Sequence, residues 1–246
     1  MTEDDFGAYD DLLLAMLEED IGEGDVTTAL FDGDREVRAV FRARSEGVMC
    51  GFPFVARLFQ IHDPSVELEP LKEEGERFGA GEELISARGR AGAILTVERT
   101  ALNLFSRLCG IAAKTRDFVE AAEGRAEILD TRKTTPLLRP FEKYAVRTGG
   151  GRNHRFGLYD QVLVKDNHLT LLGGGEEDFR ALVERARERY GPGMTVEIEV
   201  DTLEQFRLVL AAEPDIALLD NMPPETMREA ARLRDEHAAR GGKRVL

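Results

Sequence analysis

The 246-residue sequence lacks the features that mark several classes of protein. It has only two cysteines, Cys50 and Cys109, and no CxxC pair, which argues against a disulfide framework or a structural zinc site. No apolar run approaches the roughly 18–20 residues that a membrane-spanning helix needs. The acidic N-terminal region has no basic segment followed by an apolar core, so no signal peptide is expected. These absences predict a cytoplasmic protein without a membrane anchor, in which both cysteines are small buried side chains.

A cationic stretch stands out within an acidic chain. The formal net charge of the chain is -14, whereas residues 130–168 carry eight Lys or Arg against four Asp or Glu, together with His154 and His168. A local positive field of this kind suits a small ligand with several negative charges. Nucleic acid is disfavoured as a partner, because the acidic remainder of the chain would repel a long polyanion.

The first half of the chain has the pattern of a small α/β domain. Residues 37–43 alternate, with Val37, Ala39 and Phe41 on one face and arginines on the other, as in a half-exposed strand. Further strands are expected at 47–50, 66–71 and 83–87. Helices are expected at 8–19, 53–60 and 93–122, with a break at Cys109–Gly110 left open. The pattern predicts a small antiparallel sheet with helices beside it.

The second half alternates strands with helices. Short apolar runs end in charged or polar residues at 128–129, 162–164, 196–200 and 216–219, and a fifth run begins at Val245. Helical spacing lies between the later runs, at 178–190 and 203–211. Strands that alternate with helices are parallel strands. Reactive residues at the carboxyl ends of such strands are typical of (β/α) barrels.

The strand at 196–200 carries three acids on one face. Period two places Glu197, Glu199 and Asp201 together. Carboxylates inside a barrel are costly unless they bind something. The strand is therefore a candidate for the site.

Several motifs occur in one order over nearly the whole chain. They are Glu19–Gly22, Gly24–Thr28, Glu98–Asn103, Asp130–Pro136, Glu142–Val146, Gly149–Gly151, Asn153–Arg155, Lys165–His168, Glu199–Asp201 and Leu219–Asn221. In these motifs the chain closely resembles the quinolinate phosphoribosyltransferase family. The resemblance implies an α/β fold with an N-terminal α/β sandwich plus an incomplete (β/α) barrel. It places the sandwich and a linking helix in residues 1–110 and the barrel in residues 111–246.

The sequence departs from the family pattern in two places. Family members continue into a further strand and a Ser/Gly-Gly loop that holds the 5′-phosphate of the phosphoribosyl donor. The sequence ends at Arg244–Leu246, where that strand is expected to begin, so a truncated barrel domain is expected. Leu137 occupies a position where the family usually has Gly.

The resemblance implies an enzyme of de novo NAD biosynthesis, a pentosyltransferase. It would join quinolinate to phosphoribosyl pyrophosphate and release pyrophosphate, CO2 and nicotinate mononucleotide. The implied substrate-binding residues are Arg99, Thr131, Arg132, Lys133, His154, Arg155, Lys165, Glu199 and Asp220. Lys133, Lys165, Glu199 and Asp220 are implied to be catalytic. Mg2+ would bind mainly through the pyrophosphate, without a dedicated protein metal site.

Assembly is also implied by the resemblance. Arg99 would reach quinolinate from the neighbouring subunit of a homodimer or a higher homo-oligomer. No nucleic acid or membrane partner is expected. The role of Gly149–Gly151 stays open between phosphate contact and a flexible loop.

Alternative functions remain open at this point. Lys165 at a strand end could form a Schiff base, as in aldolases. A paralogue of the molybdenum-transport-operon type would bind another pyridine-like or phosphoribosyl ligand, although Arg132, His154, Arg155 and Lys165 favour quinolinate. A non-catalytic binding protein is a further alternative. Dinucleotide binding is disfavoured, because no G-x-G-x-x-G follows a predicted strand.

Overall fold

The computed structural model describes residues 7–171 and 175–246. It divides into two compact units, Met1–His154 and Arg155–Leu246, and each is described by itself. The domain boundary that the sequence predicts after residue 110 lies within a long helix, α4 (Ala91–Ala122), and it stays a prediction. The Cys109–Gly110 pair does not break this helix.

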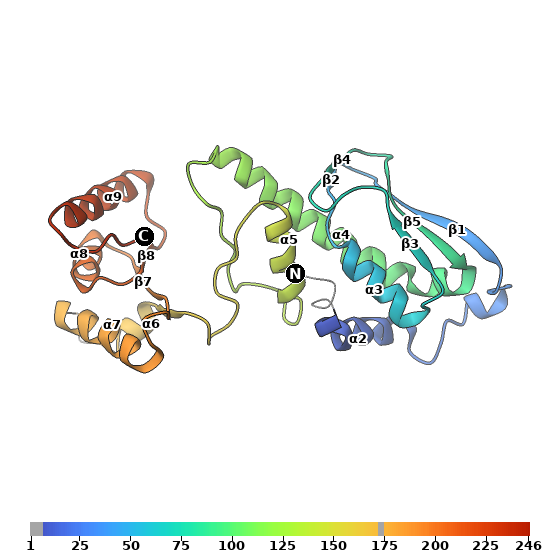
Figure 1. The fold of residues 1–246 in the computed structure, drawn as a ribbon, viewed down its shortest axis with the longest axis horizontal. Coiled ribbons are helices and arrows are strands. Elements are labelled where there is room, and N and C mark those ends of the chain that lie inside the picture. Colours follow the sequence, from blue (N-terminus) through green and yellow to red (C-terminus); the bar gives the residue numbers. More distant parts are fainter. Residues whose placement is uncertain (1–6, 172–174) are drawn as a thin grey trace. The chain divides into compact units, whose positions relative to one another are not determined.

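The first unit combines two antiparallel sheets with helices (Figure 1). Its strands are β1 (Glu36–Arg42), β2 (Gly47–Val48), β3 (Glu67–Pro70), β4 (Arg77–Phe78) and β5 (Glu83–Arg90). Its helices are η1 (Gly7–Tyr9), α2 (Asp10–Ile21), η2 (Thr28–Leu30), α3 (Phe52–His62), α4 and α5 (Arg139–Thr148). Strand β5 pairs antiparallel with β1 and β3, and β2 pairs antiparallel with β4. The expected antiparallel sheet is thus confirmed.

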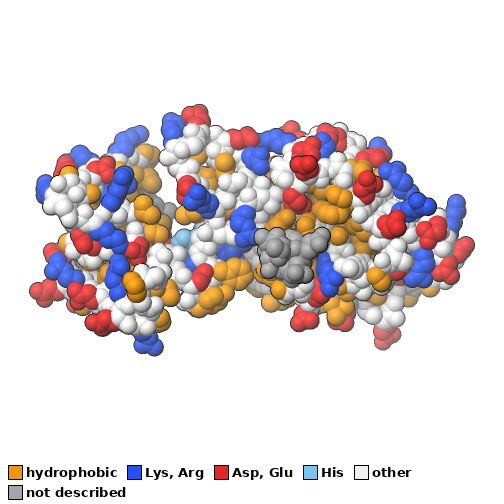
Figure 2. Space-filling model, in the orientation of Figure 1, with side chains coloured by type: hydrophobic (Ala, Val, Ile, Leu, Met, Phe, Trp, Pro, Cys, Tyr) orange, Lys and Arg blue, Asp and Glu red, His pale blue; other side chains and the backbone are white. Residues whose placement is uncertain are grey.

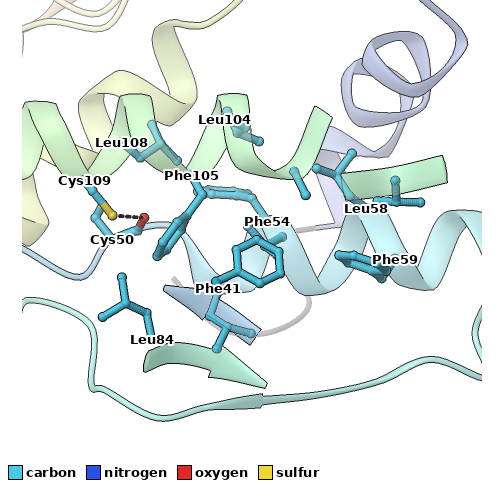
Figure 3. Close-up of a cluster of buried hydrophobic side chains, with 14 of the residues drawn as sticks. Phe41, Cys50, Phe54, Leu58, Phe59, Leu84, Leu104, Phe105, Leu108 and Cys109 are labelled. Carbon is cyan, nitrogen blue, oxygen red and sulfur yellow. Dashed lines mark hydrogen bonds between the residues drawn. The ribbon is translucent and has the colours of Figure 1, made fainter. Parts of the chain in front are cut away.

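The core of the first unit lies between α3, α4 and β1. Alternation on β1 buries Phe41, and helical spacing on α4 buries Leu104, Phe105 and Leu108. Figure 3 shows these side chains in one buried cluster with Phe54 from α3. Burial of several large apolar side chains, each worth about 1.5–3 kcal/mol, stabilises this packing.

Both cysteines belong to this core, as the sequence predicts. The Sγ atom of Cys109 lies 3.5 Å from the carbonyl oxygen of Cys50, a contact drawn in Figure 3. Burial raises the pKa of the Cys109 thiol to about 12 and also raises the pKa of Cys50. Neither thiol is therefore a reactive thiolate near neutral pH.

The second unit is built on a parallel sheet with strand order β6-β7-β8. Its elements are β6 (Val162–Val164), α6 (Asp166–Leu169), α7 (Glu176–Tyr190), β7 (Val196–Val200), α8 (Leu203–Ala212), β8 (Ile216–Leu219) and α9 (Pro224–Ala239). Among the described residues this sheet does not close into a barrel, which agrees with the expected incomplete barrel. Leu246 pairs with β8 through hydrogen bonds to Ala217 and Asp215, so the apolar run at Val245 does join the sheet.

The apolar run at 128–129 forms less structure than expected. It makes one parallel bridge, Leu129 to Arg152, instead of a strand of the parallel sheet.

Figure 2 shows basic and acidic side chains interspersed over the visible face of the molecule. In the part of the chain that the structure describes, no helix is both long and apolar enough to cross a membrane.

Candidate active site

The predicted site residues fall in both units. The first unit carries Arg99, Thr131, Arg132, Lys133 and His154, and the second carries Arg155, Lys165, Glu199 and Asp220. Two separate constellations result, and each one has its own geometry.

In the first unit, two segments about twenty residues apart run side by side. The Asp130 N–H donates to the Arg152 carbonyl at 3.1 Å, and the Arg152 N–H donates to the Ile128 carbonyl at 2.8 Å. These bonds bring the cation-bearing residues after Asp130 close to His154. Within this unit, residues that lie apart in the cationic stretch of the sequence are therefore close together in space.

A buried ion pair lies beneath these segments. Lys143 Nζ is 2.6 Å from Asp130 Oδ1, and the two side chains are only 2% and 7% exposed. The same oxygen of Asp130 accepts from the His154 N–H at 2.8 Å, and Lys143 Nζ donates to the His154 carbonyl at 2.9 Å. Asn153, with its amide turned to satisfy its neighbours, donates to Asp130 Oδ2 at 2.8 Å. The hydrogen bonds offset part of the desolvation cost of burying both charges.

The far end of the cation-bearing segment is held from α4. Arg107 Nη2 donates to Thr135 Oγ1 at 2.5 Å, and Arg107 Nε donates to Glu142 Oε1 at 3.0 Å. Sequence reasoning assigned no role to Arg107, Glu142 or Lys143. The motif Glu142–Val146 pointed to α5, but nothing in its spacing showed which side chains the helix would bury.

The three predicted residues between these anchors differ in exposure. The Thr131 hydroxyl accepts from the Lys133 N–H at 3.0 Å, which bends the chain and leaves Lys133 exposed. Arg132 is half-buried, and its Nε atom has no hydrogen-bond partner among the described residues. An arginine that is not satisfied internally is suited to an anionic ligand.

The glycines of Gly149–Gly151 serve close packing. A Cβ atom on Gly149 would lie 2.5 Å from the Ala112 carbonyl oxygen, and one on Gly151 would lie 2.8 Å from Val146 Cγ1. Arg116 Nε also donates to the Gly149 carbonyl, at 2.9 Å. Since the glycines let the end of α5 approach α4, the structure gives them a packing role.

Arg99 lies elsewhere on the first unit. Its side chain is 64% exposed, with Glu98 at 3.9 Å, and it lines a cleft of about 550 Å³ together with Arg42 and Arg44. Arg107, which holds the cation-bearing segment, follows eight residues later, roughly 12 Å along the same helix. Arg99 is thus displaced along α4 from that segment.

In the second unit, charged residues gather at the carboxyl edge of the parallel sheet. Val164 of β6 pairs with Ile198 of β7, so the next residues, Lys165 and Glu199, stand side by side. Lys165 Nζ donates to Glu199 Oε2 at 2.6 Å. Asp220 follows β8 at the same edge, where its N–H donates to the Val200 carbonyl at 3.0 Å.

The two acids of β7 and Asp201, which follows the strand, differ in their environment. Glu197 and Glu199 are buried, at 3% and 8% exposure, whereas Asp201 is exposed. Glu197 accepts a hydrogen bond from the Gln161 side chain. Lys165 satisfies one oxygen of Glu199, so Glu199 is the buried acid that lies beside a cation at the sheet edge.

Arg155 begins the second unit. Its Nη1 atom donates to the Gln161 carbonyl at 3.3 Å. Asp160 accepts from the N–H groups of Phe156 and Gly157 at 2.6 and 2.9 Å, which closes the loop that leads to β6. These bonds fix the loop between Arg155 and β6.

The described residues offer few donors for a metal ion. Among the described residues, no group of three or more His, Cys, Asp or Glu side chains is placed to hold a metal ion. Single carboxylates such as Glu199 and Asp220 are the donors that a hard cation would find, and Mg2+ usually takes one or two of these plus substrate phosphates.

Comparisons with known proteins give consistent results. The model of "Quinolinate phosphoribosyl transferase, N-terminal domain" matches residues 25–109, and that of the C-terminal domain matches residues 111–245. A "Probable nicotinate-nucleotide pyrophosphorylase [carboxylating]" from Bacillus subtilis is 42% identical over 216 residues, covering 87% of this chain and 73% of the relative. The nicotinate-nucleotide pyrophosphorylase [carboxylating] of Mycobacterium leprae is 39% identical, covering 97% and 84%.

The fold of this chain is also similar to the folds of solved structures. The crystal structure of NadC from Streptococcus pyogenes has a TM-score of 0.87 and 38% identity, covering 94% of this chain and 81% of that one. The nicotinate-nucleotide pyrophosphorylase from Francisella tularensis has a TM-score of 0.85 and 32% identity, covering 98% and 82%.

Proposed function

The chain belongs to the quinolinate phosphoribosyltransferase family, and we propose that it transfers a phosphoribosyl group from phosphoribosyl pyrophosphate to quinolinate. The reaction also removes one carboxylate, so the products are nicotinate mononucleotide, pyrophosphate and CO2. It is a pentosyltransferase of de novo NAD biosynthesis. A cytoplasmic location stays a prediction from the sequence.

The observation that carries this proposal is the state of Arg132. Arg132 lies on a segment held at Asp130 and at Thr135, and its buried Nε lacks an acceptor among the described residues. Quinolinate has two adjacent carboxylates, and guanidinium groups match carboxylates in geometry and charge. On the family resemblance we assign quinolinate binding to Arg132, His154, Arg155 and Lys165, and we include Thr131 among the substrate-binding residues.

Glu199 and Asp220 serve the ribose. Loss of pyrophosphate builds positive charge at the anomeric carbon, and carboxylates at the sheet edge stabilise that charge or hold the ribose hydroxyls. Lys165 holds Glu199 in place through their ion pair and, at 42% side-chain exposure, still presents N–H donors to an incoming anion. Lys133 and Lys165 act as the catalytic cations toward the departing phosphates.

Mg2+ is the cofactor that we propose. Glu199 and Asp220 are the side chains that would offer it oxygens, and the substrate phosphates would supply further ligands. When bound, Mg2+ neutralises charge on the pyrophosphate. The protein supplies position and electrostatic complementarity.

The Schiff-base alternative is less compatible with the geometry. Lys165 Nζ is engaged by Glu199 Oε2 at 2.6 Å, whereas imine formation needs this nitrogen free to attack a carbonyl carbon. Borohydride treatment with a carbonyl substrate separates the two functions, and no trapped adduct at Lys165 is expected.

The exposed position of Arg99 supports a shared site. We propose a homodimer or higher homo-oligomer in which Arg99 reaches the quinolinate of the neighbouring subunit. Mixing inactive Arg99→Ala and Lys165→Ala proteins should then restore part of the activity, because some mixed assemblies hold one site without either change. No recovery, despite proven subunit exchange, would show that one chain builds the whole site.

The function itself is tested with quinolinate labelled at its carboxylates. Labelled CO2 should appear only when both phosphoribosyl pyrophosphate and Mg2+ are present, together with nicotinate mononucleotide. Release of CO2 without the phosphoribosyl donor, or no product at all, would contradict the proposed reaction.

A further inference from the structure

Two neighbouring residues of α5 are charged and buried. Glu142 is 9% exposed and Lys143 is 1% exposed, although charged side chains are rarely this buried without a partner. Each one has a partner, and through these partners the two residues hold opposite ends of residues 130–135. Lys143 contacts Asp130 at its start, and Glu142 reaches Thr135 at its end through Arg107.

Lys143 also fixes the second segment of the site. Its ammonium donates to the His154 carbonyl while the Asp130 carboxylate accepts from the His154 N–H, so the backbone of His154 is held on both sides. A buried ion pair often adds little net stability compared with apolar residues of similar size. This pair does hold two loops, residues 130–135 and 152–154, in one defined position.

We propose that Glu142 and Lys143 are positioning residues that together set the geometry of the quinolinate-binding cations. Lys143 fixes Asp130 and His154, and Glu142 fixes Arg107 and Thr135. The intervening cations, Arg132 among them, are then already arranged before quinolinate binds. This preorganisation reduces the entropy cost of ordering a loop on binding. This inference rests on the proposed function, since its ligand is quinolinate.

The test combines two readouts on the Lys143→Met protein. Amide hydrogen exchange in residues 130–135 and 152–154 reports on the loops without any ligand. Calorimetry with quinolinate reports on binding. We expect faster exchange in both segments and a quinolinate Kd raised about tenfold or more.

A matched control is Asp63→Asn. Asp63 is also a buried carboxylate of the first unit, 2.6 Å from Arg90, but it lies outside the two segments. This change should lower the melting temperature and leave quinolinate affinity within about twofold of the parent. Since both changes remove a buried charged group from an ion pair, a difference between them isolates positioning from general stability.

A double-mutant cycle further distinguishes a positioning role of Lys143 from a general effect on stability. If Lys143 acts through Arg132, then Arg132→Ala should weaken quinolinate binding by a smaller factor in the Lys143→Met background than in the parent. If Lys143→Met does not fold, Lys143→Gln and Glu142→Gln carry the same measurements.

The outcomes are separable. Unchanged exchange in the two segments, or a Kd unchanged in folded Lys143→Met, would overturn the positioning role. A parent protein that fails to bind quinolinate contradicts the proposed function instead, because the exchange data do not depend on the ligand.

Discussion

Lys165 Nζ donates a hydrogen bond to Glu199 Oε2 over 2.6 Å, where the parallel strands β6 and β7 end. The side chain of Glu199 is only 10% exposed, whereas that of Lys165 is 42% exposed. The acid is therefore fixed and the cation is accessible. This asymmetry fits an acid that serves the ribose and a lysine that meets the anionic substrates.

Glu199 should matter for turnover more than for quinolinate affinity. A carboxylate cannot attract a dianionic pyridine at short range. Glu199→Gln should lower turnover about tenfold or more, equivalent to about 1.4 kcal/mol of barrier, and Asp220→Asn should behave in the same way. Steady-state kinetics at saturating phosphoribosyl pyrophosphate measures this, with the exposed Glu204→Gln as a control. Lost quinolinate affinity with normal turnover at saturation would instead make these acids substrate-orienting groups.

Leu137 should lower the free energy of unfolding of the protein. It has φ +65 and a side chain that is 73% exposed, so it carries left-handed strain without burying its apolar surface. Leu137→Gly should raise the free energy of unfolding by about 1 kcal/mol. Urea unfolding measures it. Leu158→Gly, at an equally exposed leucine without positive φ, should lower stability, and a destabilising effect at both positions would contradict strain at Leu137.

The packing role of Gly149 predicts a large difference between two Gly→Ala changes. At Gly149 the new methyl group would lie 2.5 Å from the Ala112 carbonyl and 2.7 Å from Thr115 Cβ, which should cost about 1–3 kcal/mol. At Gly110, within α4, nothing lies within 4 Å, and Ala should stabilise by about 1 kcal/mol. Thermal unfolding compares the two. Equal effects would exclude close packing as the reason for Gly149.

Asp63 should make stability depend on acid pH. Hydrogen bonds from Ser65 and Arg90 lower the pKa of the Asp63 carboxyl to about 2 in the folded protein. Because the unfolded value is about 3.9, this contribution is fully present above about pH 4 and is lost as pH falls toward 2. The stability difference between the parent and Asp63→Asn should therefore shrink over that range. A difference that stays constant with pH would show that Asp63 does not titrate as described.

The regular elements followed from local pattern. Alternation at Val37–Phe41 predicted β1, and apolar runs with charged ends predicted the three parallel strands. The acids of β7 were found in the same way, because a carboxylate at an inward position is visible in the sequence. These signals are local, so one sequence is enough to read them.

The remaining structure depends on distant contacts. Residues 128–129 are apolar, yet they form only a bridge, because their partner is the short segment at Arg152 and not another strand. The burial of Lys143 is set by Asp130 and His154, which lie 13 and 11 residues away. No periodicity encodes such pairings. The site roles of the predicted cations stay predictions until binding is measured.

Calorimetric titration of quinolinate into Arg132→Ala and Arg155→Ala proteins tests the central claim most directly. We expect each change to weaken binding by about 1.5–3 kcal/mol, the range for hydrogen bonds to charged groups. Arg152→Ala is the matched control, since Arg152 lies in the same stretch but is exposed and paired with Glu127 at 2.9 Å. Its affinity should equal that of the parent. Unchanged quinolinate affinity in both Arg132→Ala and Arg155→Ala would contradict quinolinate binding at this cationic stretch.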